Sequence, residues 1–220
     1  MSKKKFLVVD VETCNGLDNP LVYDIGGAVI DNTGKIYEYF SFIIEEIFYG
    51  CPHLMQSAYY SNKIPLYKRD LFNGKRRVAT FEQIYKYIRY LLKKYNINVF
   101  LAYNARFDRN ALNNTIQFLT DNKEKYFLPY EIDVQCIWTM AKDTICKQKT
   151  YINFCLEKGY ITDKGNLKTS AEIVYRYMTF NNNFQESHTG LEDVRIESLI
   201  FAKCIRQHKK MRRHYWDKMI

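Results

Sequence analysis

The sequence predicts an α/β domain in which helices cover a mixed, five-stranded β-sheet. Three observations support this prediction. Residues 1–44 contain three β-like segments joined by short turns, the middle of the chain alternates helical and β-like segments, and the last third is mainly helical. Strands joined by tight turns pair antiparallel, whereas strand–helix–strand units give parallel pairs. The predicted order βββαβαβ, followed by helices, therefore implies a mixed sheet covered by helices.

The first three strands are predicted at residues 5–12, 21–31 and 36–44. The first, KFLVVDVE, contains a continuous apolar run, as expected of a strand that is buried on both faces. The turn sequences NGLDNP and NTGK connect the three strands into an antiparallel meander. The second strand contains Gly26 and Gly27, which favour either a β-bulge or the close approach of another backbone.

Segment 45–79 follows the third strand and is rich in Tyr, Lys and Arg without a regular period. We expect it to be irregular and to resemble an insertion. Thr80 and Gln83 then have the spacing of a capping box. They predict the start of a helix, because apolar residues recur at helical intervals from this point to Tyr95.

The remaining elements complete the alternation. A strand, a helix and a strand are predicted at 98–104, 105–119 and 131–138. Further helices are predicted near 139–158, from Ser170 onward, and at 190–206. The basic tail at 206–220 is expected to be a frayed, solvated terminus.

Length and composition predict one intracellular domain spanning residues 1–220. The chain has neither an internal repeat nor a linker, and its 47% hydrophobic content excludes a largely disordered protein. The net charge of +9 attracts polyanions, but by itself it is equally consistent with simple solubility.

Cysteine spacing and hydrophobicity predict the compartment. The six cysteines form no CxxC pair and no zinc pattern, so we expect reduced thiols. An early acid interrupts the first apolar run, which argues against a signal peptide, and no run approaches the roughly 20 apolar residues of a membrane span. A cytoplasmic protein without membrane association is expected.

Two carboxylates stand at the end of the first strand. Asp10 and Glu12 are two residues apart, so their side chains share one face. Solvated acid pairs at strand ends are common, and the pair alone leaves that alternative open. The apolar residues before it indicate a central strand, however, and two desolvated like charges require a counter-charge. A divalent cation with oxygen ligands would provide it.

Two further acids and one histidine lie at the ends of other predicted elements. Asp108 opens the helix after the fourth strand, Asp193 lies in the first turn of the last long helix, and His188 lies five residues earlier. Each has an ordinary alternative, since acids are favourable near helix N-termini and histidines are common in loops. Together with the first pair, we expect these acids to converge at one rim of the sheet.

Three stretches resemble the motifs of DEDD-type 3′–5′ exonucleases. They are DVET at 10–13, AYNARFD at 102–108 and HTGLED at 188–193, in the family's order. The spacing of the histidine and the last aspartate resembles that of the DEDDh branch, which includes the proofreading epsilon subunit of bacterial replicases, RNase T and oligoribonuclease. The resemblance extends from Phe6 to about Cys204 and implies a ribonuclease H-like fold.

The resemblance also implies a site and a reaction. By position, Asp10, Glu12, Asp108 and Asp193 would be the acidic ligands of two Mg²⁺ or Mn²⁺ ions, and His188 would be the general base. The implied reaction is hydrolysis of the 3′-terminal phosphodiester of single-stranded DNA, which releases nucleoside 5′-monophosphates. The alternatives are an exoribonuclease that trims RNA 3′ ends, a non-catalytic module that binds 3′ ends, and a proofreading subunit attached to a polymerase. Homo-oligomers also occur in some branches.

Similarity also implies residues that contact the nucleic acid. Thr13 would lie beside the terminal nucleotide, and Asn104 and Phe107 would contribute from the second motif. Phe107 is equally typical of a core residue, and Asn104 of a cap at a strand end. Tyr103 departs from the family pattern, because many relatives carry His there, but that position is not a metal ligand in the family.

Segment 45–79 offers a candidate surface for the strand. It mixes aromatic rings, which stack on bases, with cations, which track phosphates. Tyr60, Tyr67, Lys68 and Arg69 are the predicted contacts, and a solvated Tyr-rich insertion is the alternative. Three other acids are interpreted as lying outside the site: Asp24, Asp133 and Glu192.

Overall fold

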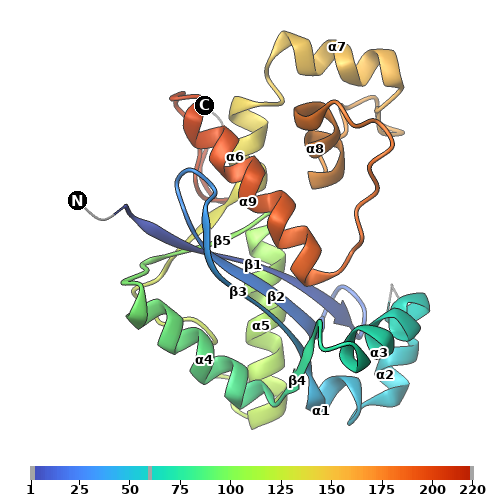
Figure 1. Ribbon diagram of the computed structural model, residues 1–220, viewed down its shortest axis with the longest axis vertical. Coiled ribbons are helices and arrows are strands. Elements are labelled where there is room, and N and C mark those ends of the chain that lie inside the picture. The colour runs from blue at the N-terminus through green and yellow to red at the C-terminus, as the bar shows by residue number, and fades with distance from the viewer. Residues whose placement is uncertain (1–2, 59–60, 219–220) are drawn as a thin grey trace.

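The computed structural model describes residues 3–58 and 61–218, and it has a mixed β-sheet with helices on both faces (Figure 1). The strand order is β4-β3-β2-β1-β5-β6. The strands are β1 (Lys5–Cys14), β2 (Leu21–Asp31), β3 (Ile36–Ile44), β4 (Arg77–Ala79), β5 (Val99–Ala102) and β6 (Asp133–Cys136). The first three form the predicted antiparallel meander, and β5 and β6 continue the sheet in parallel with β1. The predicted α/β class is confirmed, with a sixth strand added because β4 pairs with the edge of β3.

The helices divide between the two faces of the sheet (Figure 1). They are α1 (Glu45–Phe48), α2 (Pro52–Gln56), α3 (Ile64–Phe72), α4 (Phe81–Lys94), α5 (Ala105–Thr120), α6 (Ile137–Thr144), α7 (Lys149–Lys158), α8 (Ala171–Thr179) and α9 (Gly190–Arg206). Helices α4 and α5 build one hydrophobic core with the sheet, and α6 to α9 build the other. None of these helices has the length and apolar character that crossing a membrane requires.

Strand β1 contributes to both cores through the alternation of its side chains. Val9 packs in the core under α4 and α5, and Val8 packs in the core under α9. Because side chains alternate along a strand, Asp10 and Glu12 follow Val8 to the α9 side. The predicted placement of the two carboxylates on one face is therefore confirmed, and that face is the one covered by α9.

Segment 45–79 is more regular than expected. It folds into α1 to α3, a short 3₁₀ turn at Ser61–Lys63, and β4. The helices are four, five and nine residues long, so none of them repeats its apolar positions often enough to produce a recognisable period. The segment still contributes Ile47, Phe48 and Tyr67 to the core under α4 and α5.

The predicted helix at 139–158 is divided in two. Helix α6 ends at Thr144 and α7 begins at Lys149. Gln148, at the N-cap of α7, has an extended backbone with φ −71° and ψ 136°, which interrupts the helical path. Both α6 and α7 nevertheless pack into the core under α9. Apolar residues therefore recur at helical intervals on both sides of the break, which is why the sequence predicted one continuous helix.

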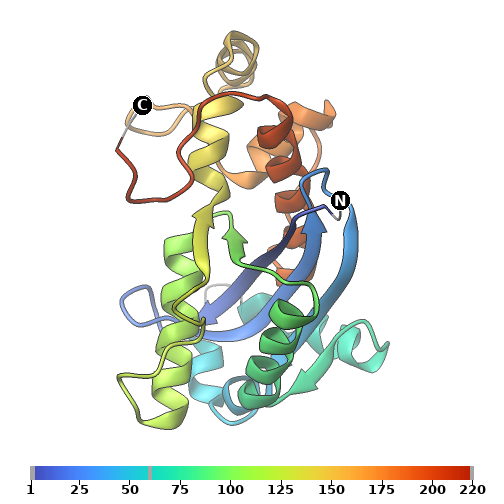
Figure 2. The same cartoon turned by 90° about the vertical axis from the view of Figure 1, so that its left-hand side faces the viewer.

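The C-terminal tail packs against the protein, so the expectation of a frayed terminus was wrong for its described part. It runs back past α6 toward β6 (Figure 2). There the N–H of Cys136 donates to the carbonyl of Arg213 at 2.6 Å, and Arg212 pairs with the buried Asp143 at 2.7 Å. The edge of β6 and a buried carboxylate both require partners, and the basic tail satisfies both.

The α9 helix approaches the sheet at one backbone contact. A Cβ added to Gly26 on β2 would lie 2.0 Å from the carbonyl carbon of Gly190, the first residue of α9. A Cβ added to Gly190 would lie 2.5 Å from the Gly26 nitrogen and 2.9 Å from the carbonyl oxygen of Asp10. Of the two interpretations of the Gly26–Gly27 pair, the structure supports close approach, because the register of β2 shifts elsewhere.

Replacing Gly190 by Ala should destabilise the fold, although alanine is the better helix former. The added methyl group has backbone on two sides, so we expect a loss of about 3 kcal/mol in the free energy of unfolding, measured by urea titration. The control is Gly165→Ala, where the added Cβ meets nothing within 4 Å and φ is +75°. It should cost only about 1 kcal/mol. Equal losses in the two variants would contradict the contact.

Candidate active site

Three of the predicted carboxylates meet at the carboxyl end of β1. Oxygen atoms of Asp10, Glu12 and Asp193 all lie within 4.8 Å of one another. Glu12 is 9% exposed and Asp193 is 4% exposed, whereas Asp10 is half-buried and so partly open to solvent. Strand β1 supplies two of these side chains and the first turn of α9 supplies the third. The close approach of Gly190 to Gly26 brings this first turn next to the end of β1.

The fourth predicted acid, Asp108, lies near this group, but it is not one of the acids whose oxygens all lie within 4.8 Å of one another. It is in the first turn of α5, is 3% exposed, and accepts a backbone hydrogen bond from Val11. Its charge acts on both Asp10 and Glu12. The structure therefore places all four acids around the end of β1.

Burial and mutual repulsion raise the pKa values of these acids. The pKa of Glu12 rises to about 9, first through burial and then through neighbouring carboxylates. The pKa of Asp193 rises to about 8 for the same two reasons, and burial raises the pKa of Asp108 to about 7. The pKa of Asp10 also lies well above its ordinary range, again with burial as the first cause. Burial and repulsion therefore disfavour the charged forms of these groups unless a counter-charge is present.

Hydrogen bonds hold the start of α9 over the strands. The Asp193 carboxylate accepts the N–H of Thr189 at 3.0 Å and the hydroxyl of Ser187 at 3.4 Å. The N–H of Gly190 donates to Asp24 on β2 at 3.1 Å. The N-terminus of a helix carries N–H groups without partners inside the helix and a partial positive charge. The Asp193 and Asp24 carboxylates accept hydrogen bonds from such N–H groups and balance part of this charge.

A buried arginine explains two acids that were interpreted as lying outside the site. The guanidinium of Arg76 lies 3.2 Å from Asp24, 3.3 Å from Asp70 and 2.8 Å from Glu192, and it also donates to Ser41. Asp24 and Glu192 thus already have a protein cation as partner. Arg76 joins segment 45–79 to β2, β3 and α9, a role that the basic composition of this segment did not indicate.

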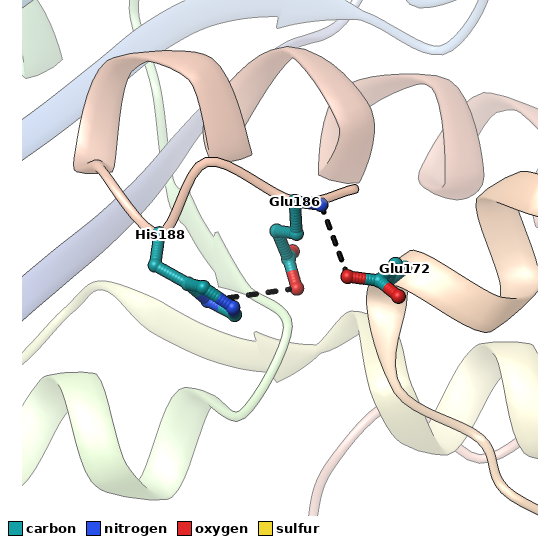
Figure 3. A group of neighbouring side chains, drawn as sticks. All are labelled: Glu172, Glu186 and His188. Atoms are coloured by element: carbon teal, nitrogen blue, oxygen red, sulfur yellow. Dashed lines mark hydrogen bonds and ion pairs between the residues drawn. The ribbon is translucent and has the colours of Figure 1, made fainter. Parts of the chain in front are cut away.

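His188 belongs to a second cluster with Glu186 and Glu172, as Figure 3 shows. Its Nδ1 lies 3.9 Å from a carboxylate oxygen of Glu186. Glu172 accepts the N–H of Glu186 at 3.0 Å and pairs with Arg176 at 2.6 Å, so part of its charge is already balanced. This cluster is therefore better suited to orienting an imidazole than to holding a cation. His188 is 36% exposed and has a left-handed backbone with φ +51°.

Lys63 and Glu186 connect the two clusters. The Lys63 ammonium donates to the carbonyl of Ser187 and interacts electrostatically with Glu12, Asp193 and Glu186. Glu186 in turn is the acid that contributes most to the raised pKa of Asp193. The loop that carries His188 therefore borders the carboxylates at the end of β1, and segment 45–79 reaches the same place through Lys63.

The nucleic-acid contacts implied by similarity occupy varied environments. Thr13 is half-buried next to the register shift that follows Glu12, and Asn104 is exposed at the N-cap of α5. Phe107 is half-buried and packs against the core under α4 and α5, as its alternative interpretation expected.

The contacts predicted in segment 45–79 are only partly available. Tyr67 is fully buried, with its ring edge-on to Tyr23 at 5.6 Å, so it cannot stack on a base and its prediction was wrong. The tyrosine packs inward because α3 uses this position to join the core. Lys68 and Arg69 are exposed on α3, and Tyr60 lies outside the described residues.

One buried acid near the site was missed by the sequence analysis. Glu197 on α9 is 2% exposed, and its charge is the strongest Coulombic influence on Asp10. Burial, followed by repulsion from Asp108 and Asp193, raises its pKa well above the usual range. A signal was available, because Glu197 follows Asp193 by four residues and must share its side of the helix.

The chemistry of this donor set fits hard divalent cations. Mg²⁺ and Mn²⁺ prefer carboxylate oxygens, and the acids at the end of β1 offer several within 4.8 Å. Glu197 adds a buried oxygen, Oε2, that has no hydrogen-bond partner among the described residues. Such an arrangement of like charges is costly without a cation and favourable with one.

Comparison with known structures identifies the fold. No protein-family model matches the sequence, and no curated protein does. Cell-death related nuclease 4 aligns with a TM-score of 0.54 at 13% identity, covering 96% of this chain and 67% of the nuclease. E. coli exonuclease I in complex with an oligonucleotide aligns at 0.51 and 13%, covering 93% of this chain and 40% of the enzyme. Exonuclease I from Methylocaldum szegediense aligns at 0.51 and 14%, with coverages of 94% and 41%.

These similarities confirm the predicted ribonuclease H-like fold. This chain spans less than half the length of the exonuclease I chains, and the identities support the fold alone.

The raised pKa values predict how stability depends on pH. A raised pKa in the folded state stabilises the fold below the unfolded pKa, near 4, and this stabilisation is lost as pH rises through the folded values of about 7 to 9. In chelator, the free energy of unfolding should therefore fall by about 2 kcal/mol or more between about pH 5 and 9. Mn²⁺ should restore stability, most strongly at the alkaline end.

Urea titrations at several pH values, with and without Mn²⁺, would measure this effect. Glu12→Gln should reduce the pH dependence, whereas the exposed Glu82→Gln should leave it unchanged. A flat profile for the parent protein in chelator would contradict the electrostatic account.

Proposed function

We propose that this protein is a metal-dependent 3′-to-5′ exonuclease that removes nucleoside 5′-monophosphates from single-stranded DNA. The observation that carries the proposal is the convergence of Asp10, Glu12 and Asp193 within 4.8 Å, with Asp108 beside them. The likeness of the fold to nucleases adds support, since one structural neighbour is a complex of E. coli exonuclease I with single-stranded DNA. The proposed compartment is the cytoplasm, in keeping with six free thiols.

In this proposal the four acids bind Mg²⁺ or Mn²⁺ and position it against the scissile phosphate. The bound ions would supply Lewis-acid stabilisation of the phosphate and an acidified water. Asp10 would contact both ions, because the other three acids all act electrostatically on its carboxylate, which supports a central position. Glu12 and Asp193 would complete the ligand set from either side.

His188 would remove the proton from the attacking water. Burial lowers the pKa of its imidazole, and the nearby Lys63 ammonium lowers it further. A lowered pKa keeps the ring neutral at physiological pH, which is the form that a general base needs. Glu186, 3.9 Å from Nδ1, would orient the ring so that the other nitrogen is free to accept the proton.

Exposed cations would hold the nucleic-acid backbone. Lys68 and Arg69 on α3 are accessible, and Lys63 is close to the carboxylates. These cations would make binding sensitive to salt. RNA is the alternative substrate, because the same chemistry acts on both nucleic acids and the discriminating contact would be to the terminal 2′-hydroxyl. Attachment to a polymerase and formation of a homo-oligomer stay as subordinate proposals.

Substitution of the site residues should abolish or strongly reduce digestion of a labelled single strand. His188→Ala should lower kcat about 10²–10⁴-fold, the usual contribution of a general base. Asp10→Ala should lower it at least as much, because it removes a proposed metal ligand. Steady-state assays with Mg²⁺ would measure both effects.

Matched controls for these variants are His53→Ala and Asp163→Ala, which remove an exposed imidazole and an exposed carboxylate elsewhere. Both should digest the substrate at the parent rate. Parent-like digestion by Asp10→Ala and His188→Ala would refute the proposal, as would full activity in excess chelator.

A substrate panel would decide between DNA and RNA. We expect single-stranded DNA to be digested from its 3′ end faster than matched RNA or blunt duplex DNA, with mononucleotides as the product. Chromatography of the products and 5′-end labelling would show both the direction and the unit of release. Faster digestion of RNA would reassign the enzyme to RNA 3′-end trimming without changing the proposed chemistry.

A further inference from the structure

A fifth acid, Glu197, is buried near the candidate site and interacts electrostatically with its acids, although it is not one of the three whose oxygens lie within 4.8 Å of one another. Glu197 is one helical turn after Asp193, so both side chains project from the same side of α9. That side packs on β1, where the first residue of α9 contacts the backbone of Asp10. Glu197 is 2% exposed and therefore belongs to the interior of the protein.

The carboxylate of Glu197 is only partly satisfied. The backbone N–H of Tyr103 is a donor to it, but Oε2 has no hydrogen-bond partner among residues 3–58 and 61–218. A buried polar atom without a partner costs about 1–3 kcal/mol, and a charged one costs more. The charged groups that act most strongly on Glu197 are themselves acids, Asp108 and Asp193, and its own charge acts on Asp10.

A cation at the end of β1 would resolve this conflict. The Arg76 guanidinium is already committed to Asp24, Asp70 and Glu192, and no ion pair of Glu197 with a basic side chain occurs within the described part of the chain. A buried, unpartnered carboxylate oxygen that is repelled by Asp108 and Asp193 gains from a nearby metal ion.

We propose that Glu197 is a fifth carboxylate of the cation site at the end of β1 and offers its buried, unpartnered oxygen to the bound cation. This inference rests on the proposed function only in assuming the same cation site. The competing arrangement is a permanently protonated Glu197 that donates a hydrogen bond to a neighbouring acid. In that case a neutral side chain of the same shape would serve equally well, and metal binding would not depend on the charge.

Glu197→Gln separates these two arrangements, because glutamine retains the shape and a donor but removes the charge. Mn²⁺ binding to chelator-treated protein would be measured by calorimetry and by electron paramagnetic resonance. We expect Glu197→Gln to weaken Mn²⁺ binding about 10–100-fold or to eliminate one bound equivalent. Glu157→Gln, which removes an exposed carboxylate on α7, should bind Mn²⁺ like the parent protein.

Two further measurements test whether Glu197→Gln disturbs folding and whether the charge of the side chain matters. In chelator, Glu197→Gln should unfold at the same or a higher temperature than the parent, because a buried amide avoids repulsion from the other acids. Glu197→Asp retains the charge on a shorter side chain and should bind Mn²⁺ more tightly than Glu197→Gln. The reverse order of these two affinities, or parent-like Mn²⁺ binding by Glu197→Gln, would overturn the inference.

Asp10→Asn distinguishes failure of this inference from failure of the proposed function. If Asp10→Asn loses both Mn²⁺ binding and digestion while Glu197→Gln retains both, only the role of Glu197 is refuted. If Asp10→Asn binds Mn²⁺ normally, the cation site itself is misplaced and the proposed function falls with it.

Discussion

The site depends on one backbone contact, the approach of α9 to β2 at Gly190 and Gly26. Neither position has room for a side chain, and the carbonyl of Asp10 is part of the same contact. Because Asp10 pairs with Gly26 across the two strands, the helix begins directly over the end of β1. This geometry brings a first-turn acid of α9 to the carboxylates of β1. A larger residue at the crossing would move α9 outward and separate the acids that converge there.

The same contact creates an electrostatic problem that the fold solves in two ways. Some acids at this rim receive a protein cation: Arg76 neutralises Asp24 and Glu192 and also ties segment 45–79 to the sheet. The others lie at the end of β1, where the Lys63 ammonium acts on Glu12 and Asp193, and all four predicted ligands there carry raised pKa values. The two groups therefore differ in their partners: the first faces a buried arginine, and the second gains most from an added cation. This division also explains why a chain with a net charge of +9 keeps a concentrated negative site.

The loop before α9 places different chemistry next to the acids. His188 is held in a left-handed conformation and lies in a second cluster with Glu186 and Glu172. Lys63, from segment 45–79, lies between the two clusters. Segment 45–79 therefore contributes to the core through Tyr67, to the rim through Arg76 and to the site through Lys63. It therefore forms part of the wall around the converging acids, which its composition alone did not indicate.

Local patterns in the sequence determined most of the strands, the capping box at Thr80 and the common face of Asp10 and Glu12, because alternation and helical period act between near neighbours. Similarity of short motifs indicated the four acids and His188. Only the tertiary structure decided that Tyr67 is buried, that the tail closes the edge of β6, and that Glu197 is buried near the carboxylates. Each of these depends on which surfaces meet after folding. Burial and charge repulsion arise between residues far apart in the chain, so no local pattern specifies them.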